Sequence, residues 1–227
     1  MVDGRTRVCG ILANPVEHTL SPVLHNTLAQ ELGHSLIYVP FKPEKAGLDI
    51  AVKGAFALNI LGLNVSVPYK QEVMKSLAAV DSDAEQIGAV NTLVRTESGY
   101  KGYNTDYLGL WRALQEEGIR LDGQEVIVFG AGGAAKAVVY LCCKKGAKRV
   151  YLLNRTLERA QGLAEEINQK FLKSCVCALP LADYREIPYK KCGYLAIQTS
   201  SVGMYPNTEQ VILEDAEWYS CFHTAFD

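Results

Sequence analysis

Short apolar runs alternate with amphipathic stretches along the first half of the chain. The runs 7–13, 36–41 and 62–67 are rich in aliphatic residues, which predicts three strands. Between them, stretches 23–32 and 48–58 repeat apolar residues at helical spacing. This strand–helix order predicts a parallel or mixed sheet covered by helices.

The segment that follows predicts a hairpin and then a helix. Apolar residues in 87–94 and 100–106 flank a turn at Ser98–Gly99, and 107–117 has a helical pattern. Polar residues gather at the ends of the two strands, at Asn91–Thr92 and at 104–106.

Strands and helices alternate through the second half of the chain. The predicted strands are 125–129, 149–153, 175–179, 194–198 and 221–227, and the predicted helices are 134–145 and 157–171. We therefore predict an α/β protein of two domains. Residues 1–105 form an α/β domain with a mixed sheet, and residues 106–227 form a doubly wound parallel sheet.

The turn after strand 125–129 has the spacing of a dinucleotide-binding loop. Gly130 allows a tight turn, Gly132 lets the backbone approach a pyrophosphate, and the small Ala135 lets helix and strand pack closely. Such turns also occur for structural reasons alone, but here the strand and the helix that the motif requires are both present. The candidate cofactor-binding residues of the turn are Gly130, Ala131, Gly132, Gly133 and Ala134.

The end of the next strand favours NADP over NAD. An NAD site usually has Asp or Glu here to hold the ribose 2′-hydroxyl, whereas this chain has Asn154 followed by Arg155. Arg155 can bind a 2′-phosphate through two parallel donors, and Arg159 lies one helical turn further on the same face. The alternative is that Thr156 caps the next helix beside two solvated arginines. Because this is the position that the motif specifies, we predict NADP as the cofactor.

Lys70 lies where the chain leaves the third strand. Pro68 ends that strand, and Lys70 then opens a predicted helix, 70–77. The helix dipole disfavours an ammonium group in a first turn, so stability alone would not select lysine here. Lys70 is therefore either a solvated surface residue or a group that exchanges protons in a reaction.

Three other polar residues have an ordinary structural interpretation besides a functional one. Ser21 with Pro22 is a good N-cap and first-turn pair for the helix that follows. Thr105 or Asp106 can equally cap the helix 107–117.

The composition is typical of a soluble globular protein and excludes several classes of function. The 227 residues are 48% hydrophobic and 21% charged, with a net charge of −2, which does not favour a nucleic-acid or membrane partner. No apolar run reaches bilayer length, and the first residues lack a signal-peptide pattern. The seven cysteines have no zinc-type spacing, and Cys142, Cys143, Cys175 and Cys177 are expected to be buried thiols. We expect a cytoplasmic protein without a metal site.

Several of these motifs, in this order, resemble the shikimate dehydrogenase family. They are T-L-S-P (19–22), N-V-S-V-P-Y-K (64–70), G-A-V-N-T (88–92), N-T-D (104–106), the glycine turn, N-R-T (154–156) and S-V-G-M (201–204). The resemblance covers essentially the whole chain. It implies an N-terminal domain for substrate binding and catalysis and a C-terminal Rossmann domain for NADP, with the active site in the cleft between them.

The resemblance implies an NADPH-dependent reduction of 3-dehydroshikimate to shikimate, in aromatic amino-acid biosynthesis. It makes Lys70 and Asp106 the catalytic pair. Hydride transfer to the 3-keto group makes an oxyanion, which needs a proton donor beside it. The Lys70 ammonium would stabilise this charge and supply the proton, while Asp106 orients the lysine. By the same resemblance Thr19, Ser21, Ser66, Asn91 and Asp106 bind substrate, Asn154, Arg155, Thr156 and Arg159 hold the 2′-phosphate, and Met204 lies beside the nicotinamide.

The sequence departs from the family pattern at three internal positions. The family usually has serine at Thr19, threonine at Ser66 and asparagine at Gln198. The first two changes keep the hydroxyl but move a methyl group, so a quinate/shikimate dehydrogenase paralogue is an alternative. We expect a monomer or a homodimer.

A further departure concerns the last strand. In the family, a glycine-rich loop and a helix with a substrate-binding glutamine follow this strand, and the present sequence does not include them. We therefore expect apolar side chains such as Phe222 or Phe226 to be exposed. A catalytically silent nucleotide-binding module is another alternative, but the presence of both Lys70 and Asp106 argues against it.

Overall fold

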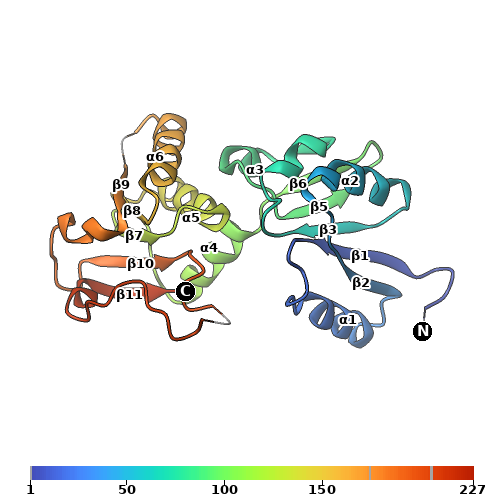
Figure 1. Cartoon of the computed structure of the whole chain (residues 1–227), viewed down its shortest axis with the longest axis horizontal. Coiled ribbons are helices and arrows are strands. Elements are labelled where there is room, and N and C mark those ends of the chain that lie inside the picture. Colours follow the sequence, from blue (N-terminus) through green and yellow to red (C-terminus); the bar gives the residue numbers. More distant parts are fainter. Residues whose placement is uncertain (1, 174, 205–206) are drawn as a thin grey trace. The chain divides into compact units, whose positions relative to one another are not determined.

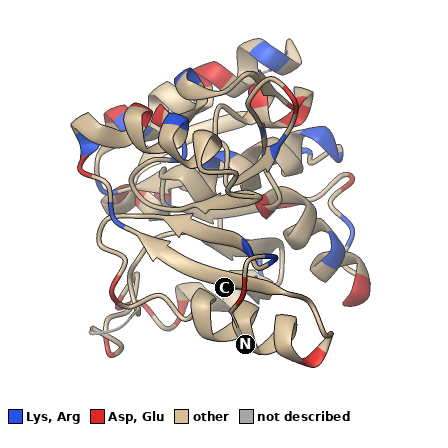
Figure 2. Ribbon diagram, turned by 90° about the vertical axis from the view of Figure 1, so that its right-hand side faces the viewer, with Lys and Arg blue, Asp and Glu red and all other residues tan. Residues whose placement is uncertain are grey.

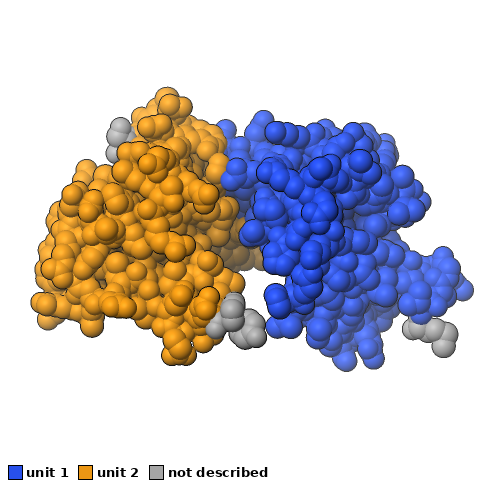
Figure 3. Space-filling model, in the orientation of Figure 1, with its two compact units in different colours: residues 1–105 blue, residues 106–227 orange. Residues whose placement is uncertain are grey.

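The chain divides into two compact units, residues 1–105 and residues 106–227, which we call unit 1 and unit 2 (Figure 3). The computed structural model describes residues 2–173, 175–204 and 207–227.

Unit 1 is built on a six-stranded mixed sheet with the order β2-β1-β3-β5-β6-β4 (Figure 1). Strand β1 pairs in parallel with β2 and β3, and β5 runs antiparallel to both β3 and β6. The strands are β1 Arg7–Leu12, β2 Leu36–Phe41, β3 Gly62–Val65, β4 Ala79–Val80, β5 Thr92–Arg95 and β6 Tyr100–Tyr103.

Helices supply the apolar partners of this sheet. The helices of unit 1 are α1 Ser21–Glu31, η1 Lys45–Gly47, α2 Leu48–Ala57, η2 Glu72–Ser76 and α3 Ser82–Ile87. Alternate residues of β3 are buried, since Leu63 and Val65 are each 2% exposed, as the period of a strand requires. Leu48 and Val52 of α2 belong to the same core cluster. Helix α1 packs against β2.

The predicted helix 70–77 is wrong. Residues 67–71 form a turn, and the five-residue 3₁₀ helix η2 begins only at Glu72. The Lys70 carbonyl accepts a hydrogen bond from the Val90 amide (2.8 Å), so it does not take part in a helical ladder. The helix-dipole argument for Lys70 therefore does not apply.

The N-cap interpretation of Ser21 is also wrong. Ser21 is the first residue of α1, and Leu20 occupies the N-cap position with helical backbone angles and no side-chain cap. Pro22 lies in the first turn as expected. Helix α3 was not predicted at all; Asp81 caps it by accepting a hydrogen bond from the Asp83 amide (3.0 Å).

Unit 2 contains a five-stranded parallel sheet with the order β11-β10-β7-β8-β9 (Figure 1). Its strands are β7 Glu125–Phe129, β8 Arg149–Asn154, β9 Val176–Pro180, β10 Tyr194–Gln198 and β11 Phe222–Phe226. Its helices are α4 Asp106–Glu116, α5 Gly133–Lys144, α6 Leu157–Phe171, η3 Leu181–Glu186 and η4 Trp218–Cys221. The chain moves outward from β7 in one direction to β8 and β9, and in the other to β10 and β11. This order is that of a doubly wound sheet with its switch point between β7 and β10, and the predicted fold class is confirmed.

The expectation that the last strand leaves its apolar side chains bare is wrong. The Phe222 ring makes edge-to-face contacts with Trp218, Tyr219 and Phe129, at centroid distances of 5.2, 5.7 and 6.2 Å. Phe226 is partly buried. The short helix η4, which carries Trp218, covers this face of the sheet. Such a 3₁₀ turn has too few residues to show a helical period in the sequence.

Burial of the cysteines is mixed. Cys142 and Cys175 are buried as predicted, whereas Cys143 is half-buried and Cys177 is exposed. The prediction is wrong for Cys177, which points to the opposite face of β9 from the buried Val176.

Charged residues of both signs are interspersed along the helices (Figure 2). None of the helices that the structure describes is long and apolar enough to cross a membrane. Within the same residues there is no group of three or more His, Cys, Asp and Glu side chains placed to hold a metal ion.

Candidate active site

The carboxyl ends of β1, β2 and β3 lie at one edge of the unit 1 sheet, because these strands are parallel. Two backbone hydrogen bonds extend the pairing beyond the strands. The Ser66 amide donates to the Leu12 carbonyl (2.9 Å), and the Asn14 amide donates to the Val67 carbonyl (3.1 Å). The loop that carries Thr19 and the segment that carries Ser66 therefore leave from the same edge.

The Thr19 and Ser21 hydroxyl groups are in contact. Thr19 Oγ1 donates to Ser21 Oγ (3.1 Å), and the Ser21 amide donates to Thr19 Oγ1 (3.3 Å). Both residues are half-buried. Ser21 is not the N-cap of α1, so its hydroxyl does not have the structural role that the sequence suggested.

Several hydrogen bonds orient the side-chain amide of Asn91. Its Oδ1 accepts from the Thr105 amide (2.9 Å) and from Thr92 Oγ1 (2.9 Å), while its Nδ2 donates to Thr105 Oγ1 (3.0 Å). This arrangement joins the start of β5 to the residue that precedes Asp106. Asp106 is itself the first residue of α4.

A buried tyrosine extends this polar cluster, and sequence reasoning missed it. The Tyr38 hydroxyl donates to Asn64 Oδ1 (2.7 Å). Tyr38 is 4% exposed, and burial raises its pKa to about 12, so the hydroxyl stays protonated and can donate at neutral pH. The side chain of Asn26 in α1 binds the Tyr38 backbone twice. Asn26 Nδ2 donates to the Tyr38 carbonyl (2.9 Å), and the Tyr38 amide donates to Asn26 Oδ1 (2.8 Å). The available signal was the polar pair His25–Asn26 on the inward side of α1, where His25 stacks on the Tyr38 ring.

Lys70 is half-buried in the turn between β3 and η2. It belongs to unit 1, whereas Asp106 is the first residue of unit 2. The pairing of these two side chains stays a prediction.

The glycine turn of unit 2 lies at the switch point of the sheet. Gly130 has φ +104°, and a Cβ at this position would lie 2.8 Å from Thr199 Oγ1 in the loop after β10. The Thr199 amide (2.9 Å) and hydroxyl (2.6 Å) both donate to the Phe129 carbonyl. Glycine is therefore required at 130 both by its backbone angle and by this close approach.

Gly132 has a different role, because nothing in the protein requires glycine there. Its φ of −92° suits any residue, and an added Cβ would meet no atom within 4 Å. Gly132 is the N-cap of α5, and its end of the helix has no side-chain cap. Open space beside uncapped helical amides suits a pyrophosphate group. The buried Ala135 (0% exposed) confirms the close packing expected of the motif.

The end of β8 presents two arginines to solvent. Asn154 Nδ2 donates to the Thr156 carbonyl (2.8 Å), which shapes the turn into α6. Thr156 occupies the N-cap position of α6, as the alternative predicts, but it makes no side-chain cap hydrogen bond. Arg155 and Arg159 are exposed, and neither has an ion-pair partner among the described residues. This leaves both guanidinium groups available to an anion.

Met204 lies in the loop after β10 and is 63% exposed. The same loop begins at Thr199, which is bound to the end of β7. The loop is therefore anchored at the switch point, where ligands bind in sheets of this kind.

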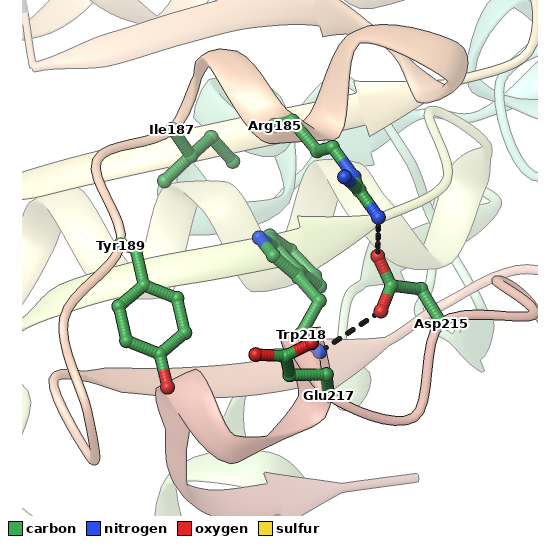
Figure 4. Close-up of a pocket in the computed structure, with 6 residues that line it drawn as sticks. All are labelled: Arg185, Ile187, Tyr189, Asp215, Glu217 and Trp218. Atoms are coloured by element: carbon green, nitrogen blue, oxygen red, sulfur yellow. Dashed lines mark hydrogen bonds and ion pairs between the residues drawn. The ribbon is translucent and has the colours of Figure 1, made fainter.

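A separate cavity of about 260 Å³ opens between η3 and the segment before β11 (Figure 4). An ion pair between Arg185 Nη2 and Asp215 Oδ2 (2.6 Å) lies at one side of it, and the buried Trp218 and Ile187 also line it. Donated hydrogen bonds from Tyr184 and Arg185 lower the pKa of Asp215. None of the predicted site residues lines this cavity, so it is not part of the candidate active site.

Unit 2 is a doubly wound sheet with a dinucleotide-binding glycine turn, and unit 1 has hydroxyl and amide groups at one edge of its sheet. Together these features define a two-domain dinucleotide-dependent oxidoreductase. Comparison with known proteins identifies the particular family. Residues 11–93 match the model described as shikimate dehydrogenase substrate binding domain, and residues 112–185 match shikimate / quinate 5-dehydrogenase. The chain belongs to the shikimate dehydrogenase family.

Relatives support this assignment over most of the chain. Shikimate dehydrogenase (NADP(+)) of Methanopyrus kandleri is 41% identical over 220 residues, which are 95% of this chain and 74% of the relative. A crystal structure of a shikimate dehydrogenase in complex with NADP⁺ matches with a TM-score of 0.83 and 36% identity, over 94% of this chain and 73% of that one. The Listeria monocytogenes enzyme, in complex with shikimate and NAD, matches with a TM-score of 0.85 and 32% identity, over 96% and 76% of the two chains.

Proposed function

We propose that this protein catalyses the reversible, NADP-dependent reduction of 3-dehydroshikimate to shikimate, a step of aromatic amino-acid biosynthesis. Family membership supports the reaction. The observation that carries the proposal is the set of hydroxyl and amide groups at one edge of the unit 1 sheet, which suits a substrate with several hydroxyls and a carboxylate.

Unit 2 binds the cofactor in this proposal. The pyrophosphate lies at the turn from Gly130 to Ala134, beside the uncapped start of α5. The exposed Arg155 and Arg159 bind the 2′-phosphate, with Asn154 and Thr156 shaping the loop. Met204 contacts the nicotinamide. When bound, NADPH supplies the hydride.

Unit 1 binds the substrate. Thr19, Ser21 and Ser66 provide hydroxyls that can donate or accept, and Asn91 provides a side-chain amide. Because Asn91 is already held by Thr92 and Thr105, little of its side-chain freedom is lost on binding.

Lys70 and Asp106 carry the proton transfer. The Lys70 ammonium donates a proton to the oxygen that gains negative charge when the 3-keto group is reduced. In the oxidation of shikimate the neutral amine takes this proton back. Asp106 accepts a hydrogen bond from the lysine and from the substrate, which orients both.

The test is the nicotinamide absorbance with shikimate as the variable substrate and NADP or NAD as the cofactor. We expect turnover with shikimate, at a higher kcat/KM with NADP than with NAD. A higher kcat/KM with quinate than with shikimate would favour the quinate/shikimate paralogue. Tight NADP binding by calorimetry without any turnover would show a silent nucleotide-binding module.

We further propose a cytoplasmic location and a monomer or homodimer, with small molecules as the only ligands of the site. Size-exclusion chromatography with light scattering measures the oligomeric state. An assembly larger than a dimer would contradict the proposal.

A further inference from the structure

Two cysteines of unit 2 that are distant in the sequence lie in contact. Cys143 is in the last turn of α5, and Cys175 directly precedes β9 (Figure 1). Their Sγ atoms are 3.0 Å apart, across a sequence separation of 32 residues. Other sulfur pairs at such a distance are absent from the part of the chain that the structure describes.

Hydrogen bonds to both its amide and its carbonyl hold the backbone of Cys175 in place. Its amide donates to Asn168 Oδ1 (3.0 Å), and its carbonyl accepts from the Val150 amide (2.8 Å). Asn168 also binds the amide and the carbonyl of Val176 (2.9 Å each). The position of Cys175 is therefore set by α6 and β8.

Cys143 is held by the end of its helix. Its carbonyl accepts from the Gly146 amide (3.2 Å) in the turn that closes α5. Because both cysteines have a fixed backbone, the contact between their sulfur atoms is a property of the fold.

The two thiols differ in access. Cys175 is 3% exposed, whereas Cys143 is half-buried, so a small oxidant in solution reaches Cys143 first. Burial raises the pKa of the Cys143 thiol. Since the thiolate is the reactive form, oxidation should be slow at neutral pH and faster at alkaline pH.

We propose that Cys143 and Cys175 form an oxidation site that closes to an intramolecular disulfide, with hydrogen peroxide as the oxidant. Cys143 first loses its proton, its thiolate attacks one peroxide oxygen, and the O–O bond breaks to give a sulfenic acid and hydroxide; the hydroxide takes up that proton and becomes water. The Cys175 sulfur then attacks the Cys143 sulfur, the S–S bond forms, and the S–O bond breaks with loss of a second water. Overall, two thiols and one peroxide give one disulfide and two waters.

The disulfide would tie the end of α5 to the start of β9. A cross-link over this length of chain restricts the unfolded state of unit 2 and so stabilises the folded one. The glycine turn lies at the opposite end of α5, about 18 Å away at 1.5 Å per residue. The proposal therefore predicts higher thermal stability with unchanged NADP affinity.

The experiment uses the full chain carrying Cys177→Ser and Cys192→Ser, which removes the two exposed thiols. The reduced protein is treated with hydrogen peroxide, its free thiols are counted in denaturant, and its peptides are mapped without reduction. We expect the count to fall from five to three, since 7 − 2 = 5 cysteines remain. We also expect a Cys143–Cys175 peptide, a Tm raised by about 4 °C or more and reversal by dithiothreitol.

The matched control adds Cys143→Ser to the same background, and a second adds Cys175→Ala. In both, the Tm increase and the cross-linked peptide should disappear. The oxidation rate of the parent should rise several-fold between pH 7 and pH 9. Linkage of Cys175 to Cys142, or a thiol count that stays at five even at pH 9, would overturn the proposal.

Discussion

At the scale of single residues, the fold orients some candidate site side chains through hydrogen bonds and leaves others without a partner among the described residues. Asn91 has its amide oxygen and nitrogen both occupied by neighbours, so its orientation is set before any ligand binds. Arg155 and Arg159, in contrast, have no partner among the described residues. A ligand that neutralises them therefore need not displace an ion pair.

Lys70→Ala should lower kcat for shikimate oxidation by about 10²–10⁴-fold, the usual contribution of a positioned proton donor or acceptor. NADP affinity should be nearly unchanged, since Lys70 is in unit 1. Steady-state kinetics and calorimetry measure the two effects. The control is Lys75→Ala, an exposed lysine in η2. A Lys70→Ala enzyme with the kcat of the parent would show that Lys70 is only a surface residue.

Arg155→Ala should weaken NADP far more than NAD. Hydrogen bonds to a charged group contribute about 1.5–3 kcal/mol, which corresponds to roughly one to two decades in affinity. Titration calorimetry with each cofactor measures the difference, with the exposed Arg120→Ala as the control. An equal loss for both cofactors would mean that Arg155 supports the fold and does not bind the 2′-phosphate.

At the scale of elements, short helices complete the sheets of both units. Helix α3 buries Ala84 and Ile87 completely, and η4 places Trp218 over the other sheet. Neither is long enough to be stable alone, so both depend on their packing, and α3 also on its Asp81 cap.

Asp81→Ala should lower the free energy of unfolding by about 0.5–2 kcal/mol, the usual cost of losing an N-cap. The Asp83 amide at the start of α3 would lose the Asp81 carboxylate that accepts its hydrogen bond. Urea denaturation measures the change. Asp81→Asn keeps an acceptor and should retain most of the stability, so equal losses in the two variants would contradict the capping role.

At the scale of the whole molecule, stability should depend on pH through carboxylates that bridge separate segments. Glu125, at the start of β7, forms ion pairs with Lys190 (2.5 Å) and Lys148 (3.3 Å), which precede β10 and β8. Its side chain is 12% exposed. The hydrogen bond from Lys190, with a smaller contribution from Lys148, lowers the Glu125 pKa below its ordinary value of 4.5.

The sign of the pH effect follows from this direction. A carboxylate with a lowered pKa in the folded state stabilises the fold above its ordinary pKa, and this stability is lost as the pH falls through the folded pKa. The free energy of unfolding should therefore decrease below about pH 4.5, and less steeply in Glu125→Gln. Denaturation at a series of pH values tests this. Glu158→Gln, at an exposed site without a described ion pair, should keep the slope of the parent.

Much of the fold was predictable because the signals are local. The strands β2, β7 and β10 and the helix α6 have the predicted bounds, since burial leaves either a periodic pattern or, for a strand buried on both faces, a continuous apolar run. The family assignment is also confirmed, because it rests on short motifs that need no knowledge of packing. The roles of the individual site residues stay predictions.

Other features required the tertiary structure. Lys70 was predicted to open a helix after Pro68, but the hydrogen bond from the Val90 amide, twenty residues later, holds its carbonyl in a turn. The partners of Tyr38, the cover over Phe222 and the contact between Cys143 and Cys175 likewise join segments that are distant in the chain. A sequence pattern records which face of an element is buried. Which residue of another element lies against that face is decided only when the sheets close and the elements pack.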